Sequence, residues 1–478
     1  MDSLAADTRW LDATAQAALV ASGEVTPLEL LEAALTRIES IDPVLNAVVI
    51  RWFDHARTVA AAVPAGVPFA GVPTLLKDLW AHYEGQTLSN GNAALRDAAP
   101  RSALDTVLVG RMRAAGFVIA GRTNSPEFGS VPTTEPLAWG PTRNPWDTAR
   151  SPGGSSGGAA AAVASGMVPI AHASDGGGSI RIPASSCGLV GLKPSQGRIS
   201  LGPLRDESNL GVELCVSRSV RDTARFLDAV RGPGVGDTVI APSPARPYAD
   251  ELGADPGRLR IGILDRRPSG DAVHPECAAA VRAAARRLDE LGHHVDEAFP
   301  PALADAEAGR RFGALWSTNM AAAIARIEDT LGRPVTEVDV EPMNWAQAGY
   351  ARRVSAVDYA LALSASAAHR RAIQQWWADG WDLLVTPTTA EPPTMLGDFA
   401  NDAGQPMAPL ARSAQFVPFT PAFNTSGQPA ISLPLHWTPD GLPVGVQFVA
   451  AYGREDVLIR IASQLEQAMP WASRRPPL

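Results

Sequence analysis

Lysine is almost absent from this chain of 478 residues. Of its 41 basic residues only Lys77 and Lys193 are lysines, so the other 39 are arginines. An arginine guanidinium stays protonated at any useful pH, whereas a buried lysine can lose its proton and act as a base. A surviving lysine is therefore a candidate for chemistry that arginine cannot perform. The chain is biased towards Ala, Arg, Gly and Pro, so either lysine could also be left over without a catalytic role. Composition alone does not distinguish these two alternatives.

Cysteine is scarce as well. The three cysteines, Cys187, Cys215 and Cys277, are odd in number and widely spaced. They match neither a zinc-ligand spacing nor a disulfide framework, so we expect a reducing, cytoplasmic environment. The first ten residues contain acidic side chains and no long apolar segment, so we expect no signal peptide.

The chain also lacks an excess of positive charge and long apolar runs. Its net charge of −9 argues against a nucleic-acid partner, which requires a basic face. No stretch approaches the roughly 18 apolar residues of a membrane helix, so we expect no membrane partner. Because 46% of the residues are hydrophobic, a large core is possible. These features predict a soluble protein that binds small or neutral molecules.

Helical patterns alternate with short apolar runs along the chain, which indicates an α/β fold. Thr26, Pro27 and Glu29 have the spacing of a helix N-terminus with a capping box. Residues 104–115 and 455–468 are also predicted to be helical, as is most of the segment from 218 to 380. The predicted strands are residues 45–50, 117–120, 260–264, 382–386, 430–433 and 444–450. With neither a repeat nor a clear linker, we predict a single large domain, 1–478.

The segment from 126 to 200 is dense in glycine and serine and contains two serine clusters, 153–158 and 175–179. Ser179 follows three glycines, so several backbone N–H groups lie close to its hydroxyl, as an oxyanion hole requires. The alternatives are a structural glycine turn and a phosphate-binding loop. No G-x-x-x-x-G-K-[ST] motif occurs, which weakens the phosphate interpretation.

A nucleophilic serine needs a base. The first cluster matches the G-x-S-x-G elbow of α/β-hydrolases, but the residues before it, 144–152, are polar and contain two prolines where that elbow needs an apolar strand. Isolated histidines such as His369 are more often surface or core residues than bases. Lys77 lies in the apolar segment Leu75–Trp80, and burial would lower its pKa. A neutral Lys77 could then accept a proton from a serine.

Taken together, the motifs resemble the amidase signature family over nearly the whole chain. The similar segments are residues 71–78, which contain Lys77, and 121–128, 140–147, 152–194, 421–429 and 441–447. The resemblance implies one domain with a central mixed β-sheet covered by helices on both faces. It places the signature core at about 71–200 and a variable, pocket-shaping helical region at about 218–420.

The resemblance also implies site residues. The family's triad is a lysine, a serine on a cis peptide and a nucleophilic serine, the two serines lying 24 residues apart, as Ser155 and Ser179 do. The implied triad is therefore Lys77, Ser155 and Ser179, with no metal or organic cofactor, and Lys193 falls in a non-catalytic motif. The implied oxyanion donors are the N–H groups of Gly176, Gly177, Gly178 and Ser179, and the implied supporting residues are Ser156 beside Lys77, Asp175 and Arg181.

Within the family, residues 10–35, 133–147 and 447–458 are most similar to the 6-aminohexanoate-cyclic-dimer hydrolase subgroup. This likeness predicts an amidase for linear or cyclic 6-aminohexanoate-type amides or aryl amides. The chain departs from the subgroup at Gly176 and Gly177, where the subgroup carries bulkier residues, and around residues 316–320. The predicted pocket residues are Trp139, Trp316, Met320, Trp345 and Phe416.

Three other functions stay open at this point. A carbamate or ester hydrolase would use the same triad and the same oxyanion chemistry. A glutamine-hydrolysing amidotransferase subunit usually carries a Tyr-Asp-Gly…Arg-Tyr-Gly segment, which this chain lacks. A non-catalytic binding relative is disfavoured by the intact set of Lys77, Ser155 and Ser179. A homodimer is compatible with all of these functions.

Overall fold

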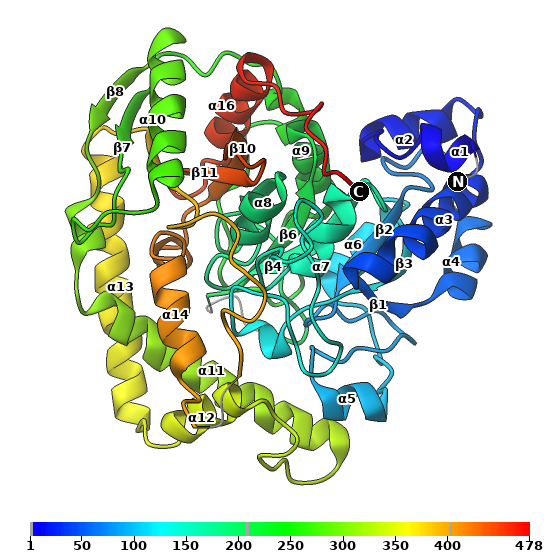
Figure 1. Ribbon diagram of the computed structural model, residues 1–478, viewed down its shortest axis with the longest axis horizontal. Helices are drawn as coiled ribbons and strands as arrows, with labels where there is room; N and C mark the ends of the chain where they lie inside the picture. Colours follow the sequence, from blue (N-terminus) through cyan, green and yellow to red (C-terminus); the bar gives the residue numbers. More distant parts are fainter. Residues whose placement is uncertain (1–2, 206–209, 402–403) are drawn as a thin grey trace.

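The computed structural model describes residues 3–205, 210–401 and 404–478, and its strands form two sheets (Figure 1). The smaller sheet has the order β1 (Val48–Arg51), β3 (Val118–Thr123), β2 (Pro73–Lys77). The larger has the order β4 (Ile170–Asp175), β6 (Val212–Ser217), β5 (Val190–Lys193), β10 (Ala430–Trp437), β11 (Pro443–Ala450), β9 (Leu383–Pro387), β7 (Arg260–Ile263), β8 (His294–Glu297). It is a mixed sheet, because β10 and β11 pair antiparallel whereas β7 and β9 pair parallel.

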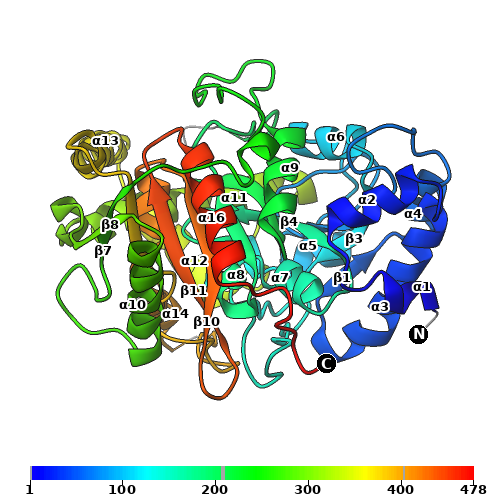
Figure 2. The same cartoon turned by 90° about the horizontal axis from the view of Figure 1, so that it is seen from above.

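The helices fall into groups along the chain. The first group lies around the small sheet, on the right in both Figure 1 and Figure 2: α1 (Ser3–Asp7), α2 (Ala13–Ala21), α3 (Pro27–Leu45), α4 (Phe53–Ala60), α5 (Ala93–Ala98) and α6 (Val107–Ala114). The next group includes the glycine- and serine-rich segment: α7 (Gly157–Ala164), α8 (Arg181–Cys187), α9 (Val220–Val230) and α10 (Pro275–Glu290). The last group is α11 (Ala308–Leu331), α12 (Pro342–Ala351), α13 (Ala356–Ala378), α14 (Ala408–Phe416), α15 (Pro421–Thr425) and α16 (Glu455–Ala468).

Helices cover both faces of the large sheet, as β11 shows. Because side chains alternate along a strand, Phe448 and Val449 point to opposite faces. Val449 packs with Ile373 and Trp376 of α13, whereas Phe448 belongs to the main hydrophobic cluster together with residues of α10 and α16. The prediction of an α/β fold with a central mixed sheet covered on both faces is therefore confirmed. The division into a signature core and a variable helical region stays a prediction.

The two sheets meet where β2 runs beside β4. Thr74 Oγ1 donates to the carbonyl of Ile170 at 2.9 Å, and the backbone N–H of Lys77 donates to His172 Nδ1 at 3.2 Å. Strand β2 ends at Lys77 and β4 ends at Asp175. Lys77 therefore lies near the end of β4, where the loop that leads to α8 begins.

The element boundaries show where local sequence signals act. Helix α3 begins with the predicted capping box, because Thr26 Oγ1 accepts from the Glu29 N–H and the Glu29 carboxylate accepts from the Thr26 N–H. The strand predicted for 45–50 was placed too early. Helix α3 continues through Leu45, Asn46 ends it with a left-handed φ of 53°, and the strand begins at Val48.

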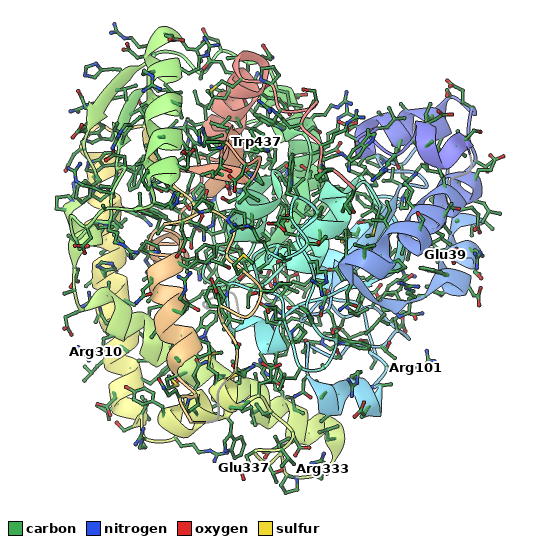
Figure 3. All side chains as sticks on the ribbon, viewed as in Figure 1. Glu39, Arg101, Arg310, Arg333, Glu337 and Trp437 are labelled. Carbon is green, nitrogen blue, oxygen red and sulfur yellow. The ribbon has the colours of Figure 1, made fainter. Side chains whose placement is uncertain are left out.

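The labelled Glu39, Arg310 and Arg333 are examples of exposed charged side chains (Figure 3). Among the residues that the structure describes, no helix combines the length and hydropathy that a membrane crossing would need.

Candidate active site

Lys77 is fully buried at the end of β2, directly after Leu75 and Leu76. Its Nζ is hydrogen-bonded to Ser155 Oγ at 2.7 Å and to Ser174 Oγ at 3.1 Å. Burial lowers the pKa of Lys77 to about 7, although the carboxylates of Asp175 and Glu213 act in the opposite direction. The amine is therefore substantially neutral near neutral pH and can accept a proton from a hydroxyl.

Ser155 follows a cis peptide bond from Gly154. The two preceding glycines are required by the backbone. Gly153 has a φ of +76°, and a Cβ on Gly154 would lie 2.2 Å from the carbonyl oxygen of Thr133. Helix α7 begins two residues after Ser155, at Gly157. The glycine-rich sequence therefore lets the Ser155 segment pack tightly against its neighbours.

Ser156 was expected beside Lys77, but its hydroxyl forms no hydrogen bond with the amine. Its hydroxyl donates to the Ser174 carbonyl at 3.2 Å and accepts from the Ser174 N–H at 3.4 Å. It therefore holds the backbone of Ser174, whose own hydroxyl contacts the lysine. Ser174 was missed because it lies outside the two glycine clusters, and only the packing of β2 beside β4, where the two sheets meet, brings it to Lys77.

The loop from Asp175 to Ile180, which carries Ser179, is organised by the Asp175 carboxylate. This carboxylate accepts from the N–H groups of Gly178 and Ile180 and forms a two-pronged pair with Arg181, at 2.9 and 3.0 Å. Burial raises the pKa of Asp175, but the Arg181 guanidinium outweighs burial and holds it at about 2. Asp175 and Arg181 thus form a fully buried ion pair that anchors the loop.

The N–H of Gly178 is not available as an oxyanion donor, because it donates to Asp175 Oδ1 at 2.6 Å. Gly178 was therefore wrongly included in the predicted donor set. Its φ is +136°, and a Cβ there would lie 2.3 Å from Thr420 Oγ1, so glycine is needed for conformation and close packing. Within the described residues, the N–H groups of Gly176, Gly177 and Ser179 donate to no protein acceptor.

Two cavities meet at Ser179. The first, of about 160 Å³, is lined by Ser155, Ser174 and Ser179, and the second, of about 380 Å³, is lined by Ser179 and mostly apolar side chains. Of the predicted pocket residues, Trp316 lines both cavities and Met320 lines the first. Other residues on the cavity walls were not predicted from sequence: Trp80, Phe128, Arg205, Phe312, Arg326 and His369.

The other three predicted pocket residues lie elsewhere. Trp139 Nε1 donates to Ser89 Oγ at 3.0 Å, away from both cavities. Phe416 is buried in a small cluster with Ile182 and Phe399. Trp345 packs behind Met320, against the cluster that holds α11 and α12 together. Of these three residues Phe416 is core, whereas Trp139 and Trp345 are partly exposed. Sequence alone did not distinguish such positions from the cavity walls.

A chain of buried side chains, His172 and Glu213, lies behind Lys77 and leads to Arg205. His172 accepts the backbone N–H of Lys77 on one side, and its Nε2 lies 3.6 Å from Glu213 on the other. Burial raises the pKa of Glu213, but the ion pair with Arg205 outweighs burial and lowers it to about 2. Arg205 in turn lines the first cavity. Through Glu213 and His172, Arg205 on the cavity wall is thus linked to the backbone of Lys77.

The described residues contain no group of three or more His, Cys, Asp or Glu side chains placed to hold a metal ion. Cys187, Cys215 and Cys277 are buried free thiols, and burial raises the pKa of each. These thiols are therefore protonated and unsuited to act as nucleophiles.

Comparison with known proteins gives consistent matches over nearly the full length. The family model for Amidase matches residues 29–459. The chain is 46% identical over 479 aligned residues to the 6-aminohexanoate-cyclic-dimer hydrolase of Paenarthrobacter ureafaciens, covering 98% of this chain and 97% of the relative. A solved structure of 6-aminohexanoate cyclic dimer hydrolase superimposes with a TM-score of 0.94 at 45% identity, covering 98% and 99% of the two chains. A bacterial aryl acylamidase superimposes with a TM-score of 0.86 at 28% identity, covering 98% of each chain.

Proposed function

The chain belongs to the amidase signature family of amidohydrolases, and we propose that it hydrolyses amide bonds through an acyl-enzyme on Ser179 with a Lys77–Ser155 proton relay. One observation carries the proposal. A fully buried lysine, whose pKa is lowered to about 7, lies 2.7 Å from Ser155 Oγ, and Ser155 and Ser179 line the same cavity. This arrangement supplies a base, a relay and a nucleophile.

In the proposed reaction, neutral Lys77 accepts the proton of Ser155 while Ser155 accepts that of Ser179. Ser179 Oγ then attacks the amide carbonyl carbon. The N–H groups of Gly176, Gly177 and Ser179 are the donors available for the oxyanion. Loss of one such donor typically lowers the rate by about 10²–10³. Asp175 and Arg181 act through the loop, which they hold in place.

Collapse of the tetrahedral intermediate breaks the C–N bond. Ser155 gives its proton to the departing amine nitrogen and is reprotonated by Lys77. Water, deprotonated by the same relay, then attacks the ester on Ser179 and releases the carboxylic acid. The net reaction consumes one water and yields one acid and one amine, and no cofactor takes part.

For the substrate we propose linear or cyclic 6-aminohexanoate-type amides or aryl amides. The 46% identity to a 6-aminohexanoate-cyclic-dimer hydrolase and the likeness to an aryl acylamidase support this class. Trp80, Phe128 and Trp316 line the first cavity, so its wall suits alkyl or aromatic groups. Carbamates and esters remain alternative substrates, because the same oxyanion chemistry serves them.

The test is an assay of the purified protein on cyclic and linear aminohexanoate amides, anilides and small dicarbamates, with mass spectrometry of the protein during turnover. We expect an acyl adduct on Ser179 and loss of at least about 10³ of the activity in Ser179→Ala. Ser165→Ala is the matched control, because Ser165 is also buried but its hydroxyl donates to the Ala162 carbonyl, away from the site. Undiminished hydrolysis by Ser179→Ala would disprove the proposed nucleophile.

A further inference from the structure

The two cavities at Ser179 differ in which reacting group they contain. Ser179, Gly129 and Trp316 line both cavities, whereas Ser155 lines only the first and Gly177 only the second. The nucleophile thus lies at the boundary between the two cavities. An amide attacked by Ser179 can therefore place one arm in each cavity.

The direction of the substrate follows from the proton transfer, and this step rests on the proposed function. The group that protonates the leaving amine must lie within hydrogen-bond reach of its nitrogen. Ser155 has this role in the proposal, and it opens only into the first cavity. The leaving amine therefore extends into the first cavity and the acyl group into the second.

The second cavity suits an uncharged acyl group. Most of its wall is apolar, including Val131, Leu303, Phe312, Leu410 and Val417. Its two titratable side chains already contact each other, because His369 Nδ1 lies 3.5 Å from Asp305 Oδ2. Asp305 is also paired with Arg311. An alkyl or aryl acyl chain would therefore meet no unpaired charge in this cavity.

The first cavity changes character along α11. Trp316, Met320, Ala323 and Arg326 recur at helical spacing on the face of α11 that lines it. At a rise of ~1.5 Å per residue, Arg326 lies about 15 Å along the helix from Trp316. Trp316 borders the nucleophile loop, since a Cβ on Gly176 would lie 3.2 Å from its ring. The cavity therefore has aromatic walls near Ser179 and a cation at its far, exposed end.

The charge of Arg326 is the one left uncompensated among the described residues of this cavity. Arg205 is paired with Glu213, and Asp175 is paired with Arg181. No described carboxylate lies within 4.0 Å of the Arg326 guanidinium. An exposed arginine is normally only solvated, but this one stands at the end of the path that the leaving amine would follow.

We propose that Arg326 selects leaving amines that carry a carboxylate several methylene groups from the nitrogen, so that the preferred substrates are N-acyl ω-amino acids with an apolar acyl group. The amide nitrogen lies at Ser155, the methylene chain lies along Trp316 and Met320, and the carboxylate meets the guanidinium at the cavity mouth. The contact lies at the protein surface, so its effect is moderate and depends on salt.

The test compares two series of amides that share one apolar acyl group. In the first series the leaving amine is an ω-amino acid of increasing length, and in the second it is the alkylamine of the same length without the carboxylate. For the best length, we expect kcat/KM to favour the acid about fivefold at low ionic strength, the size of a partly screened charge pair. The ratio of the two kcat/KM values, acid over neutral amide, should fall to about one in Arg326→Gln and should shrink at high salt.

Arg310→Gln is the matched control, because Arg310 is an exposed arginine on the same helix that lines neither cavity and points outward in Figure 3. If the wild type hydrolysed acid and neutral amides at equal rates, or if Arg326→Gln lowered both rates equally, the role of Arg326 would be overturned. The proposed function would stand in either case. Faster hydrolysis when the carboxylate is on the acyl side would overturn the orientation. If the wild type hydrolysed no amide at all, the proposed function itself would fail.

Discussion

Lys77 and Lys193 are both fully buried, and burial lowers the pKa of each to about 7. Their hydrogen-bond partners differ. Lys193 Nζ donates to the carbonyl of Pro194 at 2.9 Å, whereas Lys77 Nζ contacts the hydroxyls of Ser155 and Ser174. A carbonyl oxygen has no proton to give, but a hydroxyl has one. Two equally buried lysines can therefore differ in role, one being structural and the other a base, because their hydrogen-bond partners differ.

The two lysines provide a matched pair of variants. Lys77→Met should lower kcat by about 10²–10⁴, the usual contribution of a general base, whereas Lys193→Met should retain most activity. Lys77→Arg should be as inactive as Lys77→Met, because the guanidinium does not deprotonate. Steady-state kinetics, with circular dichroism to verify folding, is the measurement. Substantial activity in Lys77→Arg would rule out the assigned base.

The activity should depend on the protonation of Lys77. Only the neutral amine accepts a proton, so kcat/KM should rise with pH through about 7 and be lost below it. The Glu213 carboxylate favours the ammonium form and raises the pKa of Lys77. Glu213→Gln should therefore move this limb of the pH profile to lower pH. A shift to higher pH, or a limb that disappears in Lys193→Met, would contradict the assignment.

At the scale of elements, the site is built where strands end and helices begin. Strand β2 ends at Lys77 and β4 at Asp175, while α7 and α8 begin just after Ser155 and Ser179. Strands with long apolar runs, such as β9 and β11, were predicted within one residue of their ends. Strand β4 was not predicted, because its sequence IAHASD mixes polar and small residues although the whole strand is buried.

The buried pair of Asp175 and Arg181 should be essential to the loop between β4 and α8. Asp175→Asn leaves the Arg181 guanidinium buried without its counter-charge, which typically costs about 3–5 kcal/mol. We expect a clearly lower thermal midpoint and nearly complete loss of hydrolysis. Asp54→Asn is the control, because its pair with Arg57 is at the surface and its loss should change neither quantity. Unchanged stability in Asp175→Asn would show that the pair does not hold the loop.

At the scale of the whole molecule, the site needs segments from much of the chain. The lysine lies on the small sheet and the serines on the glycine-rich segment, and α11 closes the first cavity and packs against α12, α13, α15 and α5 (Figure 1). One hydrophobic cluster contains residues from Ala13 to Trp471. Segments from most of the chain therefore contribute to the walls of the two cavities.

The single chain should therefore be active without a partner protein. Size-exclusion chromatography of the purified protein should show amidase activity eluting with this chain, on simple amides rather than on glutamine. A glutamine-hydrolysing subunit would behave differently, since it works within a complex. Activity that appears only after another protein is added, or with glutamine alone, would favour the amidotransferase alternative.

The family, the α/β class and the segments that contain Lys77, Ser155 and Ser179 could be predicted from sequence, because these signals are contiguous along the chain. The contacts within the site could not, because they form between distant segments of the folded chain. The tertiary structure placed Ser174, 97 residues from Lys77, against the amine in place of Ser156, and it turned the Gly178 N–H towards Asp175. It also put Arg326 rather than Trp139 on a cavity wall. The directions of hydroxyls, N–H groups and long side chains depend on strand pairing and helix packing between distant segments, which local sequence does not encode.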